Sequence, residues 1–445
     1  MSYHIVCRIG PDDTFSPKIS KSEAVHLVSL ERPSDPRNVR IRNSVSDVLQ
    51  KAGLLPPPDA ADLLNLAMTV YAADLGIPRG LAFDRWTRDL VVHIPVIHPE
   101  KWQAEADALA LTLGFLSGDH WQVHFRKRKA ATAKAVTQQL LPPEAPSAVS
   151  LFSGGLDSFI GAVERLEHQE SLALVGHHGA GMVNSAQEHV YDALKESYPG
   201  KSRLLPFYVQ VPAGLPGRDK KTTRARSFLF LGLGTAVAAA SGKKVPLLVP
   251  ENGLISINAP LLDPRMGSLS TRTTHPHFLN QYRDLLDGID IDVSIEAPYR
   301  FHTKGEMVKG VVDNNAFRRG VFQTQSCSHP EVGRYRRRKP GTHCGYCVPC
   351  IIRRASLAAA GLDDPKHYLS NVRRKVSGGA TAEGRDLLAF KTAIERLNGA
   401  SRRHLCAEVL GSGPIPPDEV SEYVDVYKRG MAEVARFLTP VRVKV

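Results

Sequence analysis

The chain has 445 residues, 42% of them hydrophobic and 23% charged, as is ordinary for a globular protein of two or three domains with a sizeable core. Its formal net charge of +12 indicates anionic partners such as ATP, RNA or an acidic protein, without choosing among them. Six cysteines suit a reducing compartment, residues 1–12 lack the apolar region of a signal peptide, and the longest apolar run, 228–240, is too short and glycine-rich to span a bilayer. The sequence therefore predicts a cytoplasmic protein with no membrane partner.

Residues 1–145 show the hydrophobic patterns of a small α+β domain. The basic run at 126–129 is more typical of a solvated face than of a nucleic-acid patch, and the proline-rich stretch at 141–146 is typical of a linker. Strands are expected at 3–9, 89–97 and 121–125, and helices at 59–75 and 102–116.

Residues 153–158 read Ser-Gly-Gly-Leu-Asp-Ser and stand between an apolar run at 148–152 and a helical pattern at 159–166. A strand, a glycine-rich turn and a helix together present free backbone N–H groups to a phosphate, and the glycines let the backbone approach the anion closely. Asp157 would repel a phosphate, so we expect it to hold Mg²⁺ or to orient the loop.

This stretch resembles the SGGxDS loop of the PP-loop ATPases, which are adenine nucleotide alpha hydrolase-like proteins. The resemblance implies that ATP is split to AMP and pyrophosphate. Because the Gly-Lys-Ser/Thr ending of a Walker A loop is missing, hydrolysis to ADP is not the expected chemistry. A turn that merely connects strand to helix is the alternative, which the two serines and the aspartate disfavour.

From residue 147 onward the pattern alternates strands and helices, which predicts a doubly wound parallel sheet. Ligands bind beyond the carboxyl ends of such strands, where the 153–158 loop and residues 177–181, 212–221 and 251–253 are expected. Strands are expected at 149–152, 172–175, 204–211, 245–249 and 291–295, with helices at 158–168, 185–197 and 224–240.

Four cysteines follow the pattern C-x16-C-x2-C-x2-C: Cys327, Cys344, Cys347 and Cys350. Zinc takes four tetrahedral thiolates, and this spacing is typical of a zinc knuckle over 327–350. With every position taken by sulfur, no site is left for water, so the zinc is expected to be structural. Pro349 is expected to resist helix, and a helix to run from 351 to 360. A redox CxxC pair is the alternative, which leaves two of the clustered cysteines unexplained.

The phosphate loop and the cysteine knuckle together resemble the QueC family, the 7-cyano-7-deazaguanine synthases. Residues 344–353 match that family's C-G-x-C-x-P-C-x-x-R pattern, 224–231 resemble its R-N-x-x-F-L helix start, and 303–308 resemble its K-x-E-[IM]-V segment. The resemblance covers 147–375 and implies a QueC-like PP-loop ATPase domain there. An N-terminal α+β accessory domain at 1–145 and a C-terminal helical appendage at 376–445 complete the expected organisation.

The short QueC enzymes lack these two additions, and residues 251–280 match their substrate segment poorly. The longer layout looks like the QueC-like proteins of bacterial antiviral systems, in particular QatC of the Qat anti-phage defence system. It implies that a deazaguanine-type carboxylate is adenylated and then passed to an amine, such as one on a partner protein. We expect residues 1–145 to recruit that partner. A nucleic-acid partner is less favoured, because no aromatic-interleaved basic stripe is present.

The resemblance also suggests which residues act. Arg226 and Lys304, with Lys220 and Lys221 as further candidates, could neutralise charge on the phosphates. Glu251 could accept hydrogen bonds from a guanine-like base, whereas His177, His275 and His302 are possible proton shuttles that are each more typical of structural or solvent-facing histidines. The expected catalytic residues are Asp157, Ser158, Arg226 and Lys304. The expected ATP-binding residues are Ser153, Gly154, Gly155, Leu156, Asp157, Ser158 and His177.

Two other functions stay open at this point. Basic charge favours an RNA-modifying PP-loop enzyme such as a tRNA thiolase, although thiolation needs reactive cysteines and four of the six are expected to bind zinc. The third hypothesis is a non-catalytic nucleotide-binding subunit of a defence complex, which the intact Asp157 and loop serines disfavour.

Overall fold

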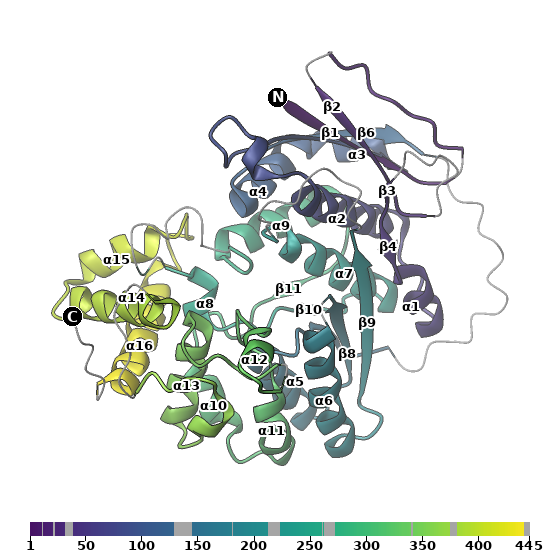
Figure 1. Cartoon of the computed structure of the whole chain (residues 1–445). Coiled ribbons are helices and arrows are strands. Elements are labelled where there is room, and N and C mark those ends of the chain that lie inside the picture. The colour runs from purple at the N-terminus through teal and green to yellow at the C-terminus, as the bar shows by residue number, and fades with distance from the viewer. Residues whose placement is uncertain are drawn as a thin grey trace.

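The computed structural model describes residues 1–10, 12–20, 23–31, 39–128, 145–179, 181–211, 223–259, 261, 272–339, 341–373 and 381–439. Figure 1 shows an N-terminal sheet with its helices, a central sheet flanked by helices, and a cluster of C-terminal helices beside them. Lys220, Lys221, Lys129 and most of the expected 141–146 linker lie outside the described residues.

The N-terminal sheet has the strand order β3-β2-β1-β5-β6, and every pairing in it is parallel. This differs from the α+β expectation, because the hydrophobic pattern of a strand does not reveal the direction of its neighbour. Its strands are β1 (Ser2–Arg8), β2 (Ala24–Ser29), β3 (Val39–Arg40), β5 (Asp89–Val96) and β6 (His120–Lys127).

One face of this sheet is apolar and is covered by helices, since Tyr3, Ile5 and Cys7 alternate toward the core. The helix expected at 102–116 is divided in two at Glu105. Helix α2 lies between the N-terminal sheet and the central part of the molecule (Figure 1). The helices of this part are α1 (Val45–Ala52), α2 (Pro58–Gly76), α3 (Pro99–Ala104) and α4 (Ala106–Ser117), with a 3-10 turn at Arg79–Leu81.

The central sheet has the order β11-β10-β7-β8-β9-β4. Strands β11 to β9 are parallel, as expected, and only β4 from the N-terminal part pairs antiparallel, at the β9 edge. The strands are β4 (Arg42–Asn43), β7 (Ala148–Leu151), β8 (Leu172–His178), β9 (Ser202–Gln210), β10 (Leu247–Leu248) and β11 (Ile295–Glu296).

Helices cover both faces of the central sheet, which confirms the doubly wound α/β fold. Alternate residues of β7 and β8 pack against α7 on one face and against α5 and α6 on the other. The helices of this part are α5 (Leu156–Glu167), α6 (Gly181–Ser197), α7 (Arg226–Ser241), α8 (Gly253–Ile257), α9 (Pro276–Gly288), α10 (Lys304–Val311) and α11 (Asn315–Gly320).

The N-terminal part and the central sheet share one hydrophobic core. Helix α2 packs on α7, with Ala67 against Gly232, and residues of both sheets belong to the same buried cluster. Arg42 and Asn43 add β4 to the central sheet. Residues 1–128 are thus packed into the α/β fold rather than attached to it by a linker alone.

The C-terminal helices share a second core with the cysteine knuckle. Residues of α16, among them Tyr427 and Met431, pack in one buried cluster with Cys344, Cys350 and α8. These helices are α12 (Val332–Tyr335), α13 (Val348–Ala359), α14 (Ala382–Leu397), α15 (Arg402–Leu410) and α16 (Val420–Leu438).

Three local expectations are wrong. Helix α13 begins at Val348, so Pro349 lies inside its first turn, where a missing N–H removes no helical hydrogen bond. The strands expected at 245–249 and 291–295 are reduced to Leu247–Leu248 and Ile295–Glu296. Among the helices of the described residues, none combines the length and apolar character that a membrane crossing requires.

Candidate active site and metal centre

The 153–158 loop joins β7 to α5 at the carboxyl edge of the central sheet. Gly154 has a φ of +75°, and a Cβ there would lie 2.8 Å from Gln187 Cγ, so the turn requires glycine. The Ser153 hydroxyl accepts from the N–H of Gly155 at 3.2 Å and lies 3.2 Å from the Ser158 hydroxyl. Gly155 is the N-cap of α5, so the orphan N–H groups of its first turn point out of this loop, as an anion site requires.

A cavity of about 400 Å³ opens beside the loop. It brings together most of the residues singled out in the sequence, and it is also lined by Glu251 and by Thr273 and Thr274. The expected site residues among its lining are Ser153, Gly155, Leu156, Asp157, Ser158, Arg226 and Lys304.

Asp157 lines this cavity and is the centre of a buried polar group. Lys304 Nζ lies 2.8 Å from Asp157 Oδ1, and Asn252 Nδ2 donates to Asp157 Oδ2 at 2.6 Å. Burial would raise the pKa of Asp157, but Lys304, Glu251 and Asn252 together lower it. Burial and the charge of Asp157 raise the pKa of Glu251 well above its usual value, so Glu251 is the neutral member of the two and its carboxyl O–H donates a hydrogen bond to Asp157.

This protonation state changes the role expected for Glu251. A neutral carboxyl bonded to Asp157 is not the simple acceptor that the base-reading hypothesis requires. Among the described residues that line the cavity, the ionised side chains are then Asp157, Lys304 and Arg226, which together carry one net positive charge beside the loop. A cavity of this sign suits a polyphosphate.

Several buried polar atoms at this edge of the sheet have no hydrogen-bond partner in the structure. Arg226 Nε and Ser227 Oγ belong to residues that line the cavity, and His177 Nδ1 and Gln187 Oε1 lie at the end of β8 and beside the loop. Buried polar atoms are almost always paired, because leaving one unpaired costs about 1–3 kcal/mol. The two unpaired atoms on cavity-lining residues, Arg226 Nε and Ser227 Oγ, indicate that a ligand completes the site.

Two expected ATP-binding residues are not among the described residues that line the cavity. The Gly154 carbonyl instead accepts from the N–H of Gln325 at 2.8 Å. His177 lies behind the wall, with its ring edge-on to Phe230 and Tyr71 and its Nε2 3.2 Å from the Val209 carbonyl. Burial and Arg226 lower the pKa of His177 to about 4, so it is neutral. Neither residue touches the cavity, so their assignment as ATP contacts stays a hypothesis.

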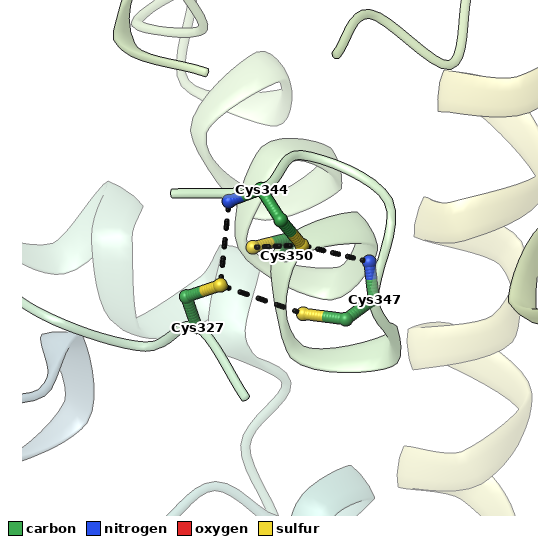
Figure 2. Close-up of side chains that lie close together, drawn as sticks. All are labelled: Cys327, Cys344, Cys347 and Cys350. Carbon is green, nitrogen blue, oxygen red and sulfur yellow. Dashed lines mark hydrogen bonds between the residues drawn. The ribbon is translucent and has the colours of Figure 1, made fainter. Parts of the chain in front are cut away.

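The four cysteine sulfurs converge, as Figure 2 shows, with Cys327 approaching the other three from a separate loop. Their sulfur atoms all lie within 4.8 Å of one another, with Cys327–Cys347 at 3.9 Å and Cys344–Cys350 at 3.8 Å. Four thiolates at a Zn–S distance of about 2.3 Å around a tetrahedral ion stand about 3.8 Å apart. All four are buried and none is in a disulfide, so the cluster fits a structural zinc ion.

Residues beside the cysteine knuckle form one wall of the cavity. Gln325 and Ser326, just before Cys327, and Pro349, just before Cys350, line it. Arg353 is buried and holds this segment by donating to the Thr324 hydroxyl and to the Val321 carbonyl. The arginine of the C-x-x-R pattern therefore ties helix α13 to the 3-10 turn at Val321–Gln323 and to Thr324, which precede Cys327.

The N-terminal part holds the helix that carries Arg226. Asp74, on α2, accepts from the N–H of Ala225 at 2.9 Å, directly before α7 begins. Trp86 lies between Arg79 and Arg224, whose guanidinium carbons are 4.8 and 4.9 Å from its ring centre. The entry to α7 is thus fixed by residues of both parts.

Two arginines of the basic run at 126–129 are held in ion pairs. Arg126 pairs with Asp13 at 2.5 Å and Arg128 with Asp62 at 2.6 Å. His275 is also structural, as expected, because its Nδ1 accepts from the N–H of His277 at 3.2 Å and its Nε2 lies 3.0 Å from the Ser412 hydroxyl.

Sequence reasoning missed several residues of the cavity wall, among them Phe230, Gln325 and Pro349. The sequence did contain a signal for the last two, because Gln325 lies two residues before Cys327 and Pro349 lies directly before Cys350. Asn252 was named only as part of an expected edge loop, and its bond to Asp157 joins residues 95 positions apart.

The parallel sheet, the loop at its carboxyl edge and the four-cysteine cluster define a PP-loop α/β fold with a zinc knuckle. No family model matches the chain. The chain is 27% identical over 249 residues to a 7-cyano-7-deazaguanine synthase of Syntrophobacter fumaroxidans, a match that spans 50% of this chain and 96% of the relative.

It is 28% identical over 255 residues to a 7-cyano-7-deazaguanine synthase of Novosphingobium aromaticivorans, over 51% of this chain and 96% of the relative. A third synthase of this name, from Brucella ovis, is 29% identical over 144 residues, or 32% of this chain and 52% of the relative. These relatives support a QueC-like family for half of the chain and an ATP-using synthase of the PP-loop type.

Proposed function

We propose that this chain activates a 7-deazaguanine-type carboxylate with ATP and transfers the acyl group to an amine. A carboxylate oxygen of the substrate attacks the α-phosphorus of ATP, the bond to the bridging oxygen breaks, and pyrophosphate leaves. The amine then attacks the carbonyl of the acyl-adenylate and loses a proton, and AMP leaves. The observation that carries the proposal is the net-positive cavity beside the Gly154–Gly155 turn, with its unpartnered buried polar atoms.

Particular residues take defined parts in this reaction. Ser153, Gly155 and the first turn of α5 bind the pyrophosphate leaving group, and Lys304 and Arg226 neutralise its developing charge. Asp157 and Ser158 are the residues that would hold Mg²⁺, which would supply positive charge to the phosphate groups. A structural zinc ion held by the four cysteines would keep Gln325 and Pro349 in the wall.

The alternative as a tRNA thiolase is disfavoured by the positions of the cysteines. Thiolation needs a reactive thiol at the ATP site. Four cysteines form the metal cluster, Cys7 is buried in the N-terminal core and Cys406 lies in α15. Within the part of the chain that the structure describes, no cysteine lines the cavity.

We further propose that the acceptor amine belongs to a partner protein, within a bacterial anti-phage defence system of the Qat type. The layout of the chain supports this, because half of it lies outside the match to the synthases. A second support is the 81–86 loop, where Leu81 and Phe83 are exposed although Asp84 fixes the backbone by accepting from Trp86 and Thr87. Rigid exposed apolar residues are typical anchors of protein interfaces.

Oxygen transfer tests the adenylation directly. A deazaguanine carboxylate labelled with ¹⁸O is incubated with the protein, ATP and Mg²⁺, and the AMP is analysed by mass spectrometry. The proposal requires one labelled oxygen in the phosphate of AMP. Unlabelled AMP would show that water, not the carboxylate, attacks ATP, and the activation step would be abandoned.

A further inference from the structure

The C-terminal helix α16 forms hydrogen bonds with the first turn of α10, the helix that begins with Lys304. Glu433 of α16 accepts hydrogen bonds from the Thr303 hydroxyl and from the N–H of Gly305, the latter at 3.2 Å. Thr303 and Gly305 flank Lys304 on both sides in the chain. The carboxylate therefore fixes the backbone immediately before and after the lysine that pairs with Asp157.

Gly305 supplies the space for this contact. A Cβ at position 305 would lie 2.6 Å from Glu433 Oε1, which is closer than a real Cβ contact allows. The backbone conformation of Gly305 does not require glycine, because this residue is the second of a regular α-helix and has no left-handed φ. The absence of a side chain at Gly305 thus lets the Glu433 carboxylate of α16 approach the backbone of α10.

Other side chains also bond to this turn of α10, but none of them takes the place of Glu433. Thr303 and Glu306 form a capping box, with Glu306 Oε2 accepting from the N–H of Thr303 at 2.8 Å. Arg429, one turn before Glu433 on α16, donates to Glu306 Oε1 at 2.7 Å and to the Phe301 carbonyl at 2.7 Å. A carboxylate at the start of a helix also interacts favourably with the helix dipole.

From these contacts we infer that Glu433 is a positioning residue for Lys304, so that α16 holds a cation of the ATP cavity in place. Lys304 is nearly buried, and its side chain has 9% of its surface exposed where it meets Asp157. A small rotation of the first turn of α10 would move its ammonium group away from the cavity. The C-terminal helices are then part of the site, although they lie beyond the segment 147–375 that carries the family motifs. The consequence for ATP rests on the proposed function, whereas the placement of Lys304 does not.

Chemical labelling of lysine tests the placement without any ligand. The full-length protein and its Glu433→Ala and Gly305→Ala variants are acetylated under limiting reagent, and the rate at Lys304 is followed by mass spectrometry. Both variants should label Lys304 at least fivefold faster than the parent, whereas Glu422→Ala, on an exposed position of α16, should leave the rate unchanged. In the double variant, Gly305→Ala should add little to the labelling rate of Glu433→Ala, because the carboxylate that an alanine at position 305 would displace is already absent. Equal rates at Lys304 in the parent, in both single variants and in the double variant would overturn the inference.

ATP binding separates positioning from a general loss of stability. Glu433→Ala should weaken ATP binding about tenfold in the parent, but less than twofold in a Lys304→Met background, where there is no ammonium left to place. An equal loss in both backgrounds would refute the positioning role. If ATP binds and responds as expected but no AMP forms, the proposed reaction fails while the inference stands.

Discussion

The ion pair between Asp157 and Lys304 allows the geometry of the cavity to be tested by stability alone. The perturbation is a double-mutant cycle of Asp157→Asn and Lys304→Met, which keeps the approximate size of both side chains. In the folded protein these two side chains have 7% and 9% of their surface exposed, and their charged atoms are 2.8 Å apart. Neither change alters the cysteine cluster.

The expected magnitude follows from two opposing terms. At 2.8 Å and an effective dielectric constant of about 20, the Coulomb attraction is about 6 kcal/mol. The cost of removing both charges from water offsets much of it, whereas removing one partner of a buried pair costs about 3–5 kcal/mol, because the other charge is left uncompensated. Asn252 still satisfies one Asp157 oxygen, so we expect each single variant to lose about 3 kcal/mol and the double variant about 4 kcal/mol. The coupling energy is then about 2 kcal/mol.

Urea unfolding followed by tryptophan fluorescence and circular dichroism measures these free energies. Lys309→Met, at an exposed position of the same helix, is the control and should lie within about 0.5 kcal/mol of the parent. A coupling energy below about 0.5 kcal/mol would refute the buried pair, and with it the account of how Lys304 is held at the cavity.

Three further predictions concern the metal, the buried histidine and the loop. Metal analysis should find one zinc per chain, and Cys347→Ser should lower both the melting temperature and the affinity for ATP, because the knuckle forms a wall of the cavity; a metal-free protein of unchanged stability would contradict this. Burial lowers the pKa of His177 to about 4 in the folded protein. As the pH falls below about 6.5, the unfolded chain therefore binds a proton at this histidine while the folded chain does not, which lowers the free energy of unfolding. The parent should therefore lose about 2 kcal/mol more of its unfolding free energy between pH 7 and pH 5 than His177→Gln does, and parallel profiles would show that His177 is not buried neutral. Ser153→Ala should lower AMP formation on the order of 10²–10³-fold with zinc content and fold intact, and near-normal pyrophosphate release would remove the loop from the mechanism.

The central features of the fold follow from local sequence. The apolar run before Ser153, the two glycines and the helical pattern after them are contiguous, so the strand, turn and helix could be predicted together. The cysteine spacing likewise predicts a cluster, because three of its four members lie within seven residues. Both features appear in the structure where the sequence places them.

The features that sequence reasoning missed depend on long-range contacts. Strand β4 has two residues and is defined only by its pairing with β9, more than 160 positions away. The bond of Glu433 to Gly305 joins residues 128 positions apart, and nothing local to either residue indicates it. The basic run at 126–129 was expected to face solvent, but whether Arg126 meets Asp13 depends on the fold of residues 1–128 as a whole.

This shared packing changes how the role of residues 1–145 should be tested. Deleting residues 1–140 would strip α2 from the surface of α7 and would also remove the bond of Asp74 to Ala225, directly before α7 begins. Because α7 carries Arg226, adenylation and partner binding would be lost together. Phe83→Ser is the better perturbation, because Phe83 is fully exposed and the change leaves that core intact. It should preserve AMP formation and weaken transfer to the partner protein.

The nucleotide products of the full-length protein test the central claim most directly. The protein is incubated with ATP, Mg²⁺ and a 7-deazaguanine carboxylate, with an amine supplied, and the nucleotides are separated by ion-exchange chromatography. The account predicts AMP and pyrophosphate in equal amounts, dependent on the carboxylate and lost in Lys304→Met. Formation of ADP and phosphate, or AMP release that does not respond to any deazapurine carboxylate, would contradict it.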